Sequence, residues 1–138
     1  MRDRPRVGVS MMPLENRRDV LLSLATTADR LGYDAFMLPE TWAYDVTVLL
    51  ADAARRTDRI RIGTGILGVW SRSPATIAMA AATLHALSGG RFSLGLGAST
   101  PQLVEGLHDV PFARPLARMR QTVTQVRALL REIGRAHV

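Results

Sequence analysis

The sequence predicts an α/β fold in which parallel strands alternate with helices. Short runs rich in Val, Ile, Leu and Phe alternate with longer runs whose apolar residues recur at helical spacing. The centres of the short runs lie about 26 to 30 residues apart, as expected for successive strand–helix units. The chain has 138 residues, 47% of them hydrophobic, so it is long enough to form one domain with its own core.

The first two strand–helix units lie in the first half of the chain. Strands are predicted at 6–10 and 35–39, and helices at 20–31 and 46–54. Gly32 follows the first helix and is the residue type that most often ends one. Asp45 is the expected N-cap of the second helix, because its carboxylate can accept hydrogen bonds from the first backbone N–H groups.

Two more units follow in the second half. Strands are predicted at 60–66 and 91–96, and helices at 74–87 and 115–130. Ser73 and Pro74 form a helix start in which Ser caps the helix and Pro occupies its first position, where no N–H is needed. Gly89 and Gly90 end this helix, and Pro115 opens the last one.

Two architectures fit these four units: an open sheet with helices on both faces, and part of a (β/α)8 barrel. A complete barrel takes about 250 residues, so four units would form about half of one. The alternation alone leaves both architectures open. In both, ligands bind at the carboxyl ends of the parallel strands, which here are residues 10–12, 40–42, 65–68 and 97–100.

Glu40 and Trp42 directly follow the second predicted strand and are candidate catalytic residues. The carboxylate of Glu40 could orient or protonate a substrate, and the indole of Trp42 could form the wall of a pocket for a planar ring. The alternative is structural. Glu40 would then form an ion pair with Arg72, and Trp42 would cover the mouth of the barrel.

Glycine-rich stretches end the third and fourth strands. Gly63-Thr64-Gly65 favours a bulge or a close approach of the backbone to a ligand, although it could also be a simple strand end. The stretch Gly95-Leu96-Gly97-Ala98-Ser99-Thr100 forms a loop of mainly small residues with two hydroxyl groups, which suit a phosphate group, but it could equally be a tight turn. It lacks the third glycine of a dinucleotide-binding loop and does not follow the first strand, so a Rossmann site is excluded.

The composition excludes several classes of chemistry. There is no Cys, hence no disulfide, thiolate metal site, iron–sulfur cluster or cysteine nucleophile. All 18 basic residues are Arg, which excludes a Walker lysine and Schiff-base chemistry within the chain. The three His lie too far apart for a zinc-binding pair, no metal site is predicted, and no Gly-x-Ser-x-Gly hydrolase motif occurs.

The net charge of +6 is spread along the chain, and no stacking aromatic residues are interleaved with the arginines. This pattern favours a solvated surface over a nucleic-acid partner. No apolar stretch reaches the roughly 18 residues of a membrane span, and the first residues lack the pattern of a signal peptide. We therefore expect a cytoplasmic protein without a membrane partner.

Several segments together resemble the bacterial luciferase-like superfamily, above all its branch of coenzyme F420-dependent oxidoreductases, which includes proteins similar to methylenetetrahydromethanopterin reductase. The resemblance extends from about residue 6 to residue 132. Its most specific part is the block Ser88-Gly89-Gly90-Arg91-Phe92 followed by Leu94-Gly95-Leu96-Gly97. Further matching segments are 31–34, 38–42, 60–65, 71–74 and 105–106.

This resemblance implies a (β/α)8 barrel, of which residues 1–132 would be the N-terminal half with four β/α units. It also implies that the tricyclic ring of coenzyme F420 lies against a bulge at the end of the third strand. By resemblance, Gly65 and Ile66 form this bulge through a cis peptide bond, and Leu67 lies beside it. A non-proline cis bond costs about 3 kcal/mol, so packing and the cofactor would have to support it.

The resemblance implies two further parts of the cofactor site. The loop of Gly97, Ala98 and Ser99 corresponds to the place where the family holds the phosphate-bearing side chain of the cofactor. Glu40 matches an acidic position beside the ring, whereas Thr41 stands where some relatives carry His. The resemblance therefore does not identify the proton donor.

The implied reaction is hydride transfer between carbon 5 of coenzyme F420 and a small organic substrate. The cofactor does the chemistry, and the protein provides the pocket and the orientation. The alternative within the family is an FMN-dependent monooxygenase, and the whole protein is expected to be a homodimer. The alternative of another class is a truncated, non-catalytic half-barrel fragment, because four strands leave two unpaired edges that invite association.

The last six residues, 133–138, break the resemblance abruptly. Their sequence, Ile-Gly-Arg-Ala-His-Val, is similar to the in-frame translation of a common sequencing adapter. We expect a non-native tail here, and the codons of the coding DNA test this expectation.

Overall fold

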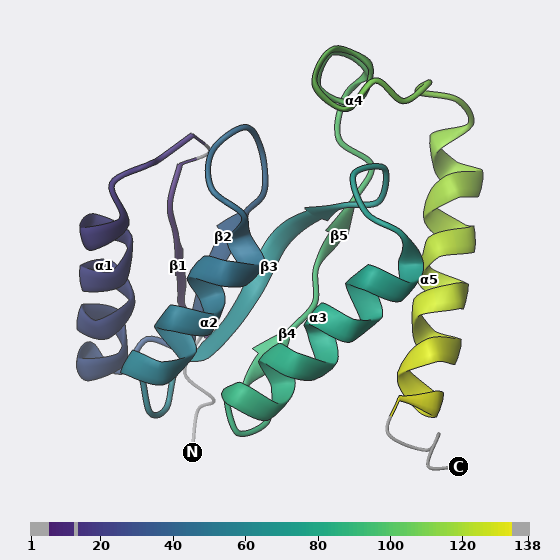
Figure 1. Ribbon diagram of the computed structural model, residues 1–138. Helices are drawn as coiled ribbons and strands as arrows, with labels where there is room; N and C mark the ends of the chain where they lie inside the picture. Colours follow the sequence, from purple (N-terminus) through teal and green to yellow (C-terminus); the bar gives the residue numbers. More distant parts are fainter. Residues whose placement is uncertain (1–5, 13, 134–138) are drawn as a thin grey trace.

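A computed structural model describes residues 6–12 and 14–133, in which parallel strands alternate with helices (Figure 1). The strands are β1 (Gly8–Ser10), β2 (Ala35–Pro39), β3 (Arg61–Gly68), β4 (Phe92–Ser93) and β5 (Leu96–Gly97). The helices are α1 (Arg18–Leu31), α2 (Val46–Arg56), α3 (Pro74–Leu87), α4 (Pro101–His108) and α5 (Pro115–Glu132). The predicted α/β class is confirmed.

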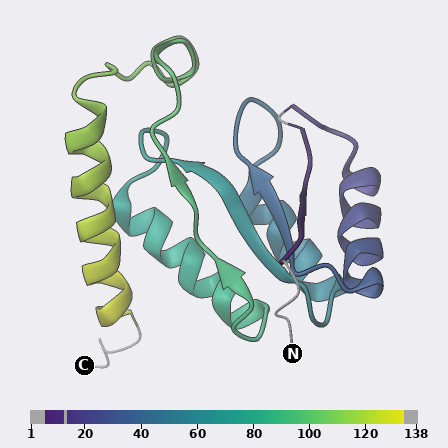
Figure 2. The same ribbon diagram turned by 180° about the vertical axis from the view of Figure 1, so that it is seen from behind.

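The sheet decides between the two architectures that the sequence left open. Its strands are all parallel and lie in the order β1-β2-β3-β4, with β5 pairing farther along β3. Helices α1, α2 and α3 cover one face, whereas none of the described helices lies over the face that Figure 2 presents. A doubly wound sheet would have helices on both faces and a reversal of strand order. The topology is therefore that of half a (β/α)8 barrel.

The core lies between the sheet and this layer of helices. Phe36 and Leu38 of β2 and Ile62 of β3 are buried, and they pack on apolar side chains of the helices, among them Leu21 and Ala25 in α1, Leu50 and Ala53 in α2, and Ile77 and Leu84 in α3. Helix α5 lies beside α3 and buries Thr122 and Val126 there. One helical layer thus holds the strand ends in fixed positions.

The predicted helix ends are confirmed. Gly32 adopts a left-handed conformation with φ of 78° at the end of α1. Asp45 caps α2 by accepting a hydrogen bond from the backbone N–H of Thr47 at 2.8 Å. Ser73 caps α3 by accepting from the N–H of Thr76 at 3.1 Å. Each cap stabilises its helix by about 1 kcal/mol.

The fourth predicted strand, residues 91–96, is wrong as a single strand. The structure contains the separate strands β4 and β5 instead, with Leu94 and Gly95 between them. The buried hydroxyl of Thr64 accepts a hydrogen bond from the N–H of Gly95 and donates one to its carbonyl, both at 2.8 Å. The carbonyl of Gly95 also accepts from the backbone N–H of Leu67 at 2.9 Å, but its own N–H binds the Thr64 side chain in place of a backbone carbonyl, and the strand is interrupted here.

The bulge predicted at Gly65 is present, but without the cis peptide bond. Leu38 pairs with Thr64 and Pro39 with Ile66, so Gly65 is the extra residue of β3. None of the peptide bonds in the described residues is cis, and the expected cis bond between Gly65 and Ile66 is therefore wrong. The extra residue bends the strand by itself, as bulges generally do.

Candidate functional site

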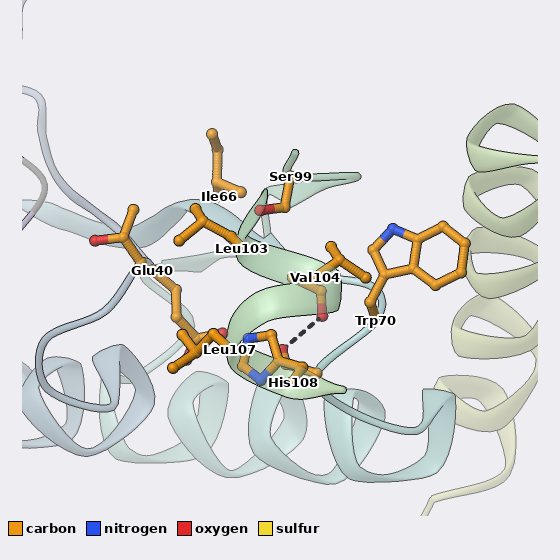
Figure 3. A pocket seen from close by; sticks show the side chains of 11 residues that line it. Glu40, Ile66, Trp70, Ser99, Leu103, Val104, Leu107 and His108 are labelled. Atoms are coloured by element: carbon orange, nitrogen blue, oxygen red, sulfur yellow. Dashed lines mark hydrogen bonds between the residues drawn. The ribbon is translucent and has the colours of Figure 1, made fainter. Parts of the chain in front are cut away.

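The carboxyl ends of β2, β3 and β5 meet around a small cavity that α4 closes on one side (Figure 3). Glu40 enters it from the end of β2, Ile66 from β3 and Ser99 from the loop after β5. Helix α4 contributes Leu103, Val104, Leu107 and His108. Residues that are up to 68 positions apart in the sequence, Glu40 and His108, thus line one cavity.

A wider groove continues outward from this cavity. The two share the side chains of Glu40, Thr41, Ser71, Leu107 and His108. The groove adds the loop between β2 and α2, including Trp42 and Tyr44, and the start of α3. We refer to the cavity and the groove together as the cleft.

Glu40 and Arg72 form an ion pair at the junction of the cavity and the groove. A guanidinium nitrogen of Arg72 lies 2.6 Å from Oε1 of Glu40 and 2.9 Å from Oδ2 of Asp45. The side chains of Glu40 and Arg72 are only 13% and 17% exposed. The structural alternative for Glu40 is therefore confirmed, and it does not exclude a role in binding, because one carboxylate oxygen remains outside the pair.

The contacts between Arg72 and the two carboxylates shift the pKa values of Arg72 and Asp45. The hydrogen bond to Glu40 raises the pKa of Arg72 above its ordinary value, and the bond to Asp45 contributes to the same effect although burial opposes it. Burial alone would raise the pKa of Asp45, but hydrogen bonds from Thr47 and Arg72 outweigh it and hold that pKa below its ordinary value. Arg72 is thus a fixed positive charge shared by two carboxylates.

Three buried polar atoms around this pair have no hydrogen-bond partner within the described residues. They are Oε2 of Glu40, Oγ1 of Thr41 and Nε of Arg72. A buried donor or acceptor without a partner costs about 1 to 3 kcal/mol, so such atoms are uncommon in folded proteins unless a water or a ligand meets them. Glu40 and Thr41 both line the cleft, where a bound molecule can reach them.

At the bulge of β3, Gly65 and Ile66 are exposed, whereas the next residue, Leu67, is buried. Ile66 is 43% exposed and lines the cavity, and Gly65 is also exposed. Leu67 is 1% exposed and belongs to the core, so its side chain faces the helices. Of the three predicted ring contacts, Gly65 and Ile66 can offer an open face, and Leu67 could contribute only its backbone.

The loop after β5 packs closely against the bulge. A Cβ on Gly97 would collide with Cγ2 of Ile66, so glycine at this position leaves room for that side chain. The carbonyl of Ala98 accepts a hydrogen bond from Nε1 of Trp70 at 2.8 Å. Ser99 is exposed, has a positive φ of 60° and lines the cavity. The loop is therefore fixed on one side and open on the other.

Four of the eight predicted site residues line the cleft, and the other four lie in the backbone that supports it. Glu40, Ile66 and Ser99 line the cavity, and Trp42, which is 71% exposed, lines the adjoining groove. The remaining four, Gly65, Leu67, Gly97 and Ala98, lie in the strands and loop that support this wall. Within residues 6–12 and 14–133, no three His, Asp or Glu side chains are grouped to hold a metal ion.

Helix α4 is the part of the site that the sequence reasoning missed. His108, which that reasoning left in a loop before the last helix, is the last residue of α4, and Leu103 and Leu107 face the cavity from the same helix. The signal was present: Thr100 caps α4 and Pro101 begins it, just as Ser73 and Pro74 begin α3.

Comparison with known proteins identifies the family. The family model described as luciferase-like monooxygenase matches residues 4–137. The chain belongs to this family. The N-terminal half-barrel inferred from the resemblance agrees with this membership and with the observed topology.

One curated relative and two solved structures illustrate the relationship. The "Putative coenzyme F420-dependent oxidoreductase" of Mycobacterium tuberculosis is 43% identical over 104 residues, which are 75% of this chain and 30% of that protein. The monooxygenase RslO1 of Streptomyces bottropensis superposes with a TM-score of 0.81 at 25% identity, over 89% of this chain and 42% of that chain. The F420-dependent tetrahydromethanopterin reductase of Methanopyrus kandleri gives 0.78 at 21% identity, over 88% and 39%.

The chain thus spans about a third of the curated relative and about two fifths of the two structures. Among the helices of the described residues, none is both long and apolar enough for a membrane span.

Proposed function

We propose that this chain is the cofactor-binding half of an oxidoreductase that transfers a hydride between coenzyme F420 and a small organic substrate. The observation that carries the proposal is the bulge of β3, where Gly65 is exposed and the exposed side chain of Ile66 lines the cavity. The M. tuberculosis relative, named for F420, supports the choice of cofactor. The cytoplasmic location and the homodimer of the whole protein stay predictions.

The residues present fit such a cofactor. A flat ring needs an open wall of backbone. Gly65 offers one, because glycine has no side chain to hold a ring away from the backbone. Even an added Cβ would lie 3.6 Å from its nearest neighbour, so the position is not crowded. The unpartnered atoms of Glu40 and Thr41 could pair with polar atoms of a ring edge or of a substrate bound beside it. The exposed Ser99 loop is suited to the phosphate-bearing side chain, as small loops with backbone N–H groups generally are.

When bound, the cofactor would supply the carbon that carries the hydride. The chain would orient its partner. Arg72 fixes the carboxylate of Glu40, whose second oxygen stays available as an acceptor. The apolar side chains of Ile66, Leu103 and Leu107 would keep water from the reacting atoms, which strengthens every polar contact inside the cavity.

Titration with each cofactor, followed by its visible spectrum, tests the proposal. We expect the visible spectrum of coenzyme F420 to change saturably as the protein is added, and the spectrum of FMN to stay unchanged. Ile66→Asp should weaken F420 binding at least tenfold, because a charge on the open wall repels an apolar ring face. Val48→Asp, at an exposed position of α2, is the matched control and should bind like the original chain. Tight binding of FMN without any response to F420 would reverse the choice of cofactor.

The second candidate function is an FMN-dependent monooxygenase. The structural likeness to the monooxygenase RslO1, at 25% identity, favours it. The candidate of another class, a non-catalytic half-barrel that associates through its sheet edges, is favoured by the position of β1 and β4 at the two edges of the sheet of the described residues. Gel filtration tests this last candidate, since a monomer without cofactor would contradict association.

A further inference from the structure

We propose that the cleft binds a neutral substrate with a hydroxymethyl group on a flat ring, the hydroxyl between Glu40 and Thr41 and the ring against Trp42. The inference deepens the proposed function, on which it rests, by naming a class of substrate. It is carried by three properties of the cleft: its unpartnered polar atoms, its charge and its exposed aromatic side chains.

The unpartnered atoms require a group that both donates and accepts. Oε2 of Glu40 is buried, and as a carboxylate oxygen in an ion pair it can only accept a hydrogen bond. Oγ1 of Thr41 is also buried without a partner, and its hydroxyl can donate. A substrate hydroxyl can donate to Glu40 and accept from Thr41 at the same time. An ammonium group has no acceptor, and a carboxylate or phosphate has no proton for Glu40.

The charge of the cleft disfavours an anionic substrate. Arg72 is the nearest positive charge, and it is already shared between Glu40 and Asp45 at 2.6 Å and 2.9 Å. Two carboxylates and one guanidinium leave a net negative charge at the junction. An anion would therefore meet net repulsion from the two carboxylates that already engage Arg72, whereas a neutral hydroxyl does not.

The outer part of the cleft offers aromatic side chains without ring partners. Trp42 is 71% exposed and Tyr44 is 48% exposed, and both line the groove. The other tryptophan, Trp70, packs instead on Phe112 with ring centroids 5.4 Å apart and lies under Arg118. A large aromatic side chain at the mouth of a pocket gains by covering a flat ligand, because offset stacking is worth about 0.5 to 1.5 kcal/mol beyond the buried area.

The apolar lining between the two ends fits the same class of molecule. Ile66, Leu103 and Leu107 line the cavity next to Glu40 (Figure 3). Together with the aromatic groove they form a path that is polar at one end and apolar along its length. A flat hydrocarbon ring with a hydroxymethyl group at one edge matches this arrangement, and a fully polar ligand such as a free sugar does not.

Three probes with one ring and different head groups test the inference: 2-naphthalenemethanol, 2-naphthalenemethylamine and 2-naphthoate. The chain has two tryptophans, so its indole N–H groups give two NMR signals, and Trp70→Phe identifies the signal of Trp42. We expect the alcohol to shift the Trp42 signal saturably and to bind at least fivefold more tightly than the amine or the carboxylate. Tightest binding of either charged probe, or no saturable shift with the alcohol, would overturn the inference.

Variants of Thr41 and Trp42 separate binding from folding. Thr41→Val keeps the shape but removes the hydroxyl, and it should weaken binding of the alcohol about three- to tenfold, the value of one hydrogen bond. Thr41→Ser should restore it, and equal binding by both variants contradicts the inference. Trp42→Ala, followed through the Leu107 amide signal, should weaken binding, whereas Tyr33→Ala, outside the cleft, should not.

The outcome is distinguishable from failure of the proposed function. The probe titrations need no cofactor, and the F420 titration needs no substrate. If F420 binds and the alcohol does not, the substrate class is wrong and the cofactor proposal stands. If neither F420 nor FMN binds, the proposed function fails whatever the probes do.

Discussion

Individual glycines determine how closely the strands approach one another behind the site. A Cβ on Gly95 would collide with the backbone carbonyl of Thr64, and one on Gly63 would lie 2.5 Å from the carbonyl oxygen of Ser93. Neither oxygen can move without breaking the sheet. Gly65 differs, since its nearest neighbour to such a Cβ is the backbone nitrogen of Pro39 at 3.6 Å.

This difference predicts opposite outcomes for two equivalent substitutions. Gly95→Ala should lower the free energy of unfolding by about 1 to 3 kcal/mol, the usual effect of overpacking. Gly65→Ala should change it by less than about 1 kcal/mol, and in the stabilising direction, because Ala restricts the unfolded chain. Urea unfolding followed by circular dichroism measures both. Equal destabilisation by the two variants would contradict the close packing of Gly95.

The sequence predicts the positions of such residues better than their roles. It identified Glu40 and its possible partner Arg72, because a carboxylate after a strand and an arginine before a helix are visible in the chain. From the sequence, Gly95 and Gly97 are attributed to a ligand-binding loop or a tight turn. Their requirement comes from Thr64 and Ile66, on another strand, and only the register of the sheet brings these residues into contact.

At the scale of elements, the connections between helices and strands depend on a few polar side chains. Asp29 in α1 accepts hydrogen bonds from the backbone N–H groups of Asp58, Arg59 and Ile60 at 2.9, 3.0 and 2.7 Å, which fixes the start of β3. Arg91 donates to the carbonyls of Ala54, Thr57 and Ile60 at 3.0, 2.8 and 2.7 Å. It thereby joins the end of α2 to the same strand.

Asp29→Asn should reduce stability in a manner that depends on pH. Burial opposes the charge, but the three backbone N–H groups outweigh it and hold the pKa of Asp29 below its ordinary value. A lowered folded-state pKa contributes stability above the unfolded value of about 3.9, and this stability is lost as the pH falls through the folded value. We therefore expect the variant to lose about 1 to 2 kcal/mol at pH 7 and the difference to shrink below about pH 4.

Denaturant unfolding of both proteins from pH 3 to pH 7 measures this difference. Asp58→Asn is the matched control, because the Asp58 side chain makes no hydrogen bond within the described residues and the same charge is removed. A loss that is independent of pH, or an equal loss in the control, would contradict the role of the Asp29 carboxylate.

Periodicity and capping signals predicted α1, α2, α3 and α5, because each has an apolar face and a marked end. They did not predict α4, which has eight residues and buries only Val104. Nor did they predict the break between β4 and β5. That break depends on the hydroxyl of Thr64, about 30 residues earlier in the chain, and no local pattern carries such information.

At the scale of the whole molecule, the order of the strands and the single helical layer make the chain a half-barrel. The alternation of elements predicted the parallel sheet, but it could not choose between a barrel and an open sheet, because both have the same local pattern. The resemblance chose the barrel correctly. The expectation of a non-native tail at 133–138 concerns residues that, apart from Ile133, lie outside the described ones, and it stays a prediction.

The central claim is that the strand ends form one site for the cofactor, with the bulge of β3 as its wall. Mapping of backbone amide NMR signals during titration with coenzyme F420 tests this most directly. We expect the largest shifts at Gly65, Ile66 and Ser99, and none at Gly32 or Arg59, which line a hollow that shares no residue with the cleft. Saturable binding of F420 with its largest shifts around Gly32 and Arg59, and none at the bulge, would contradict it.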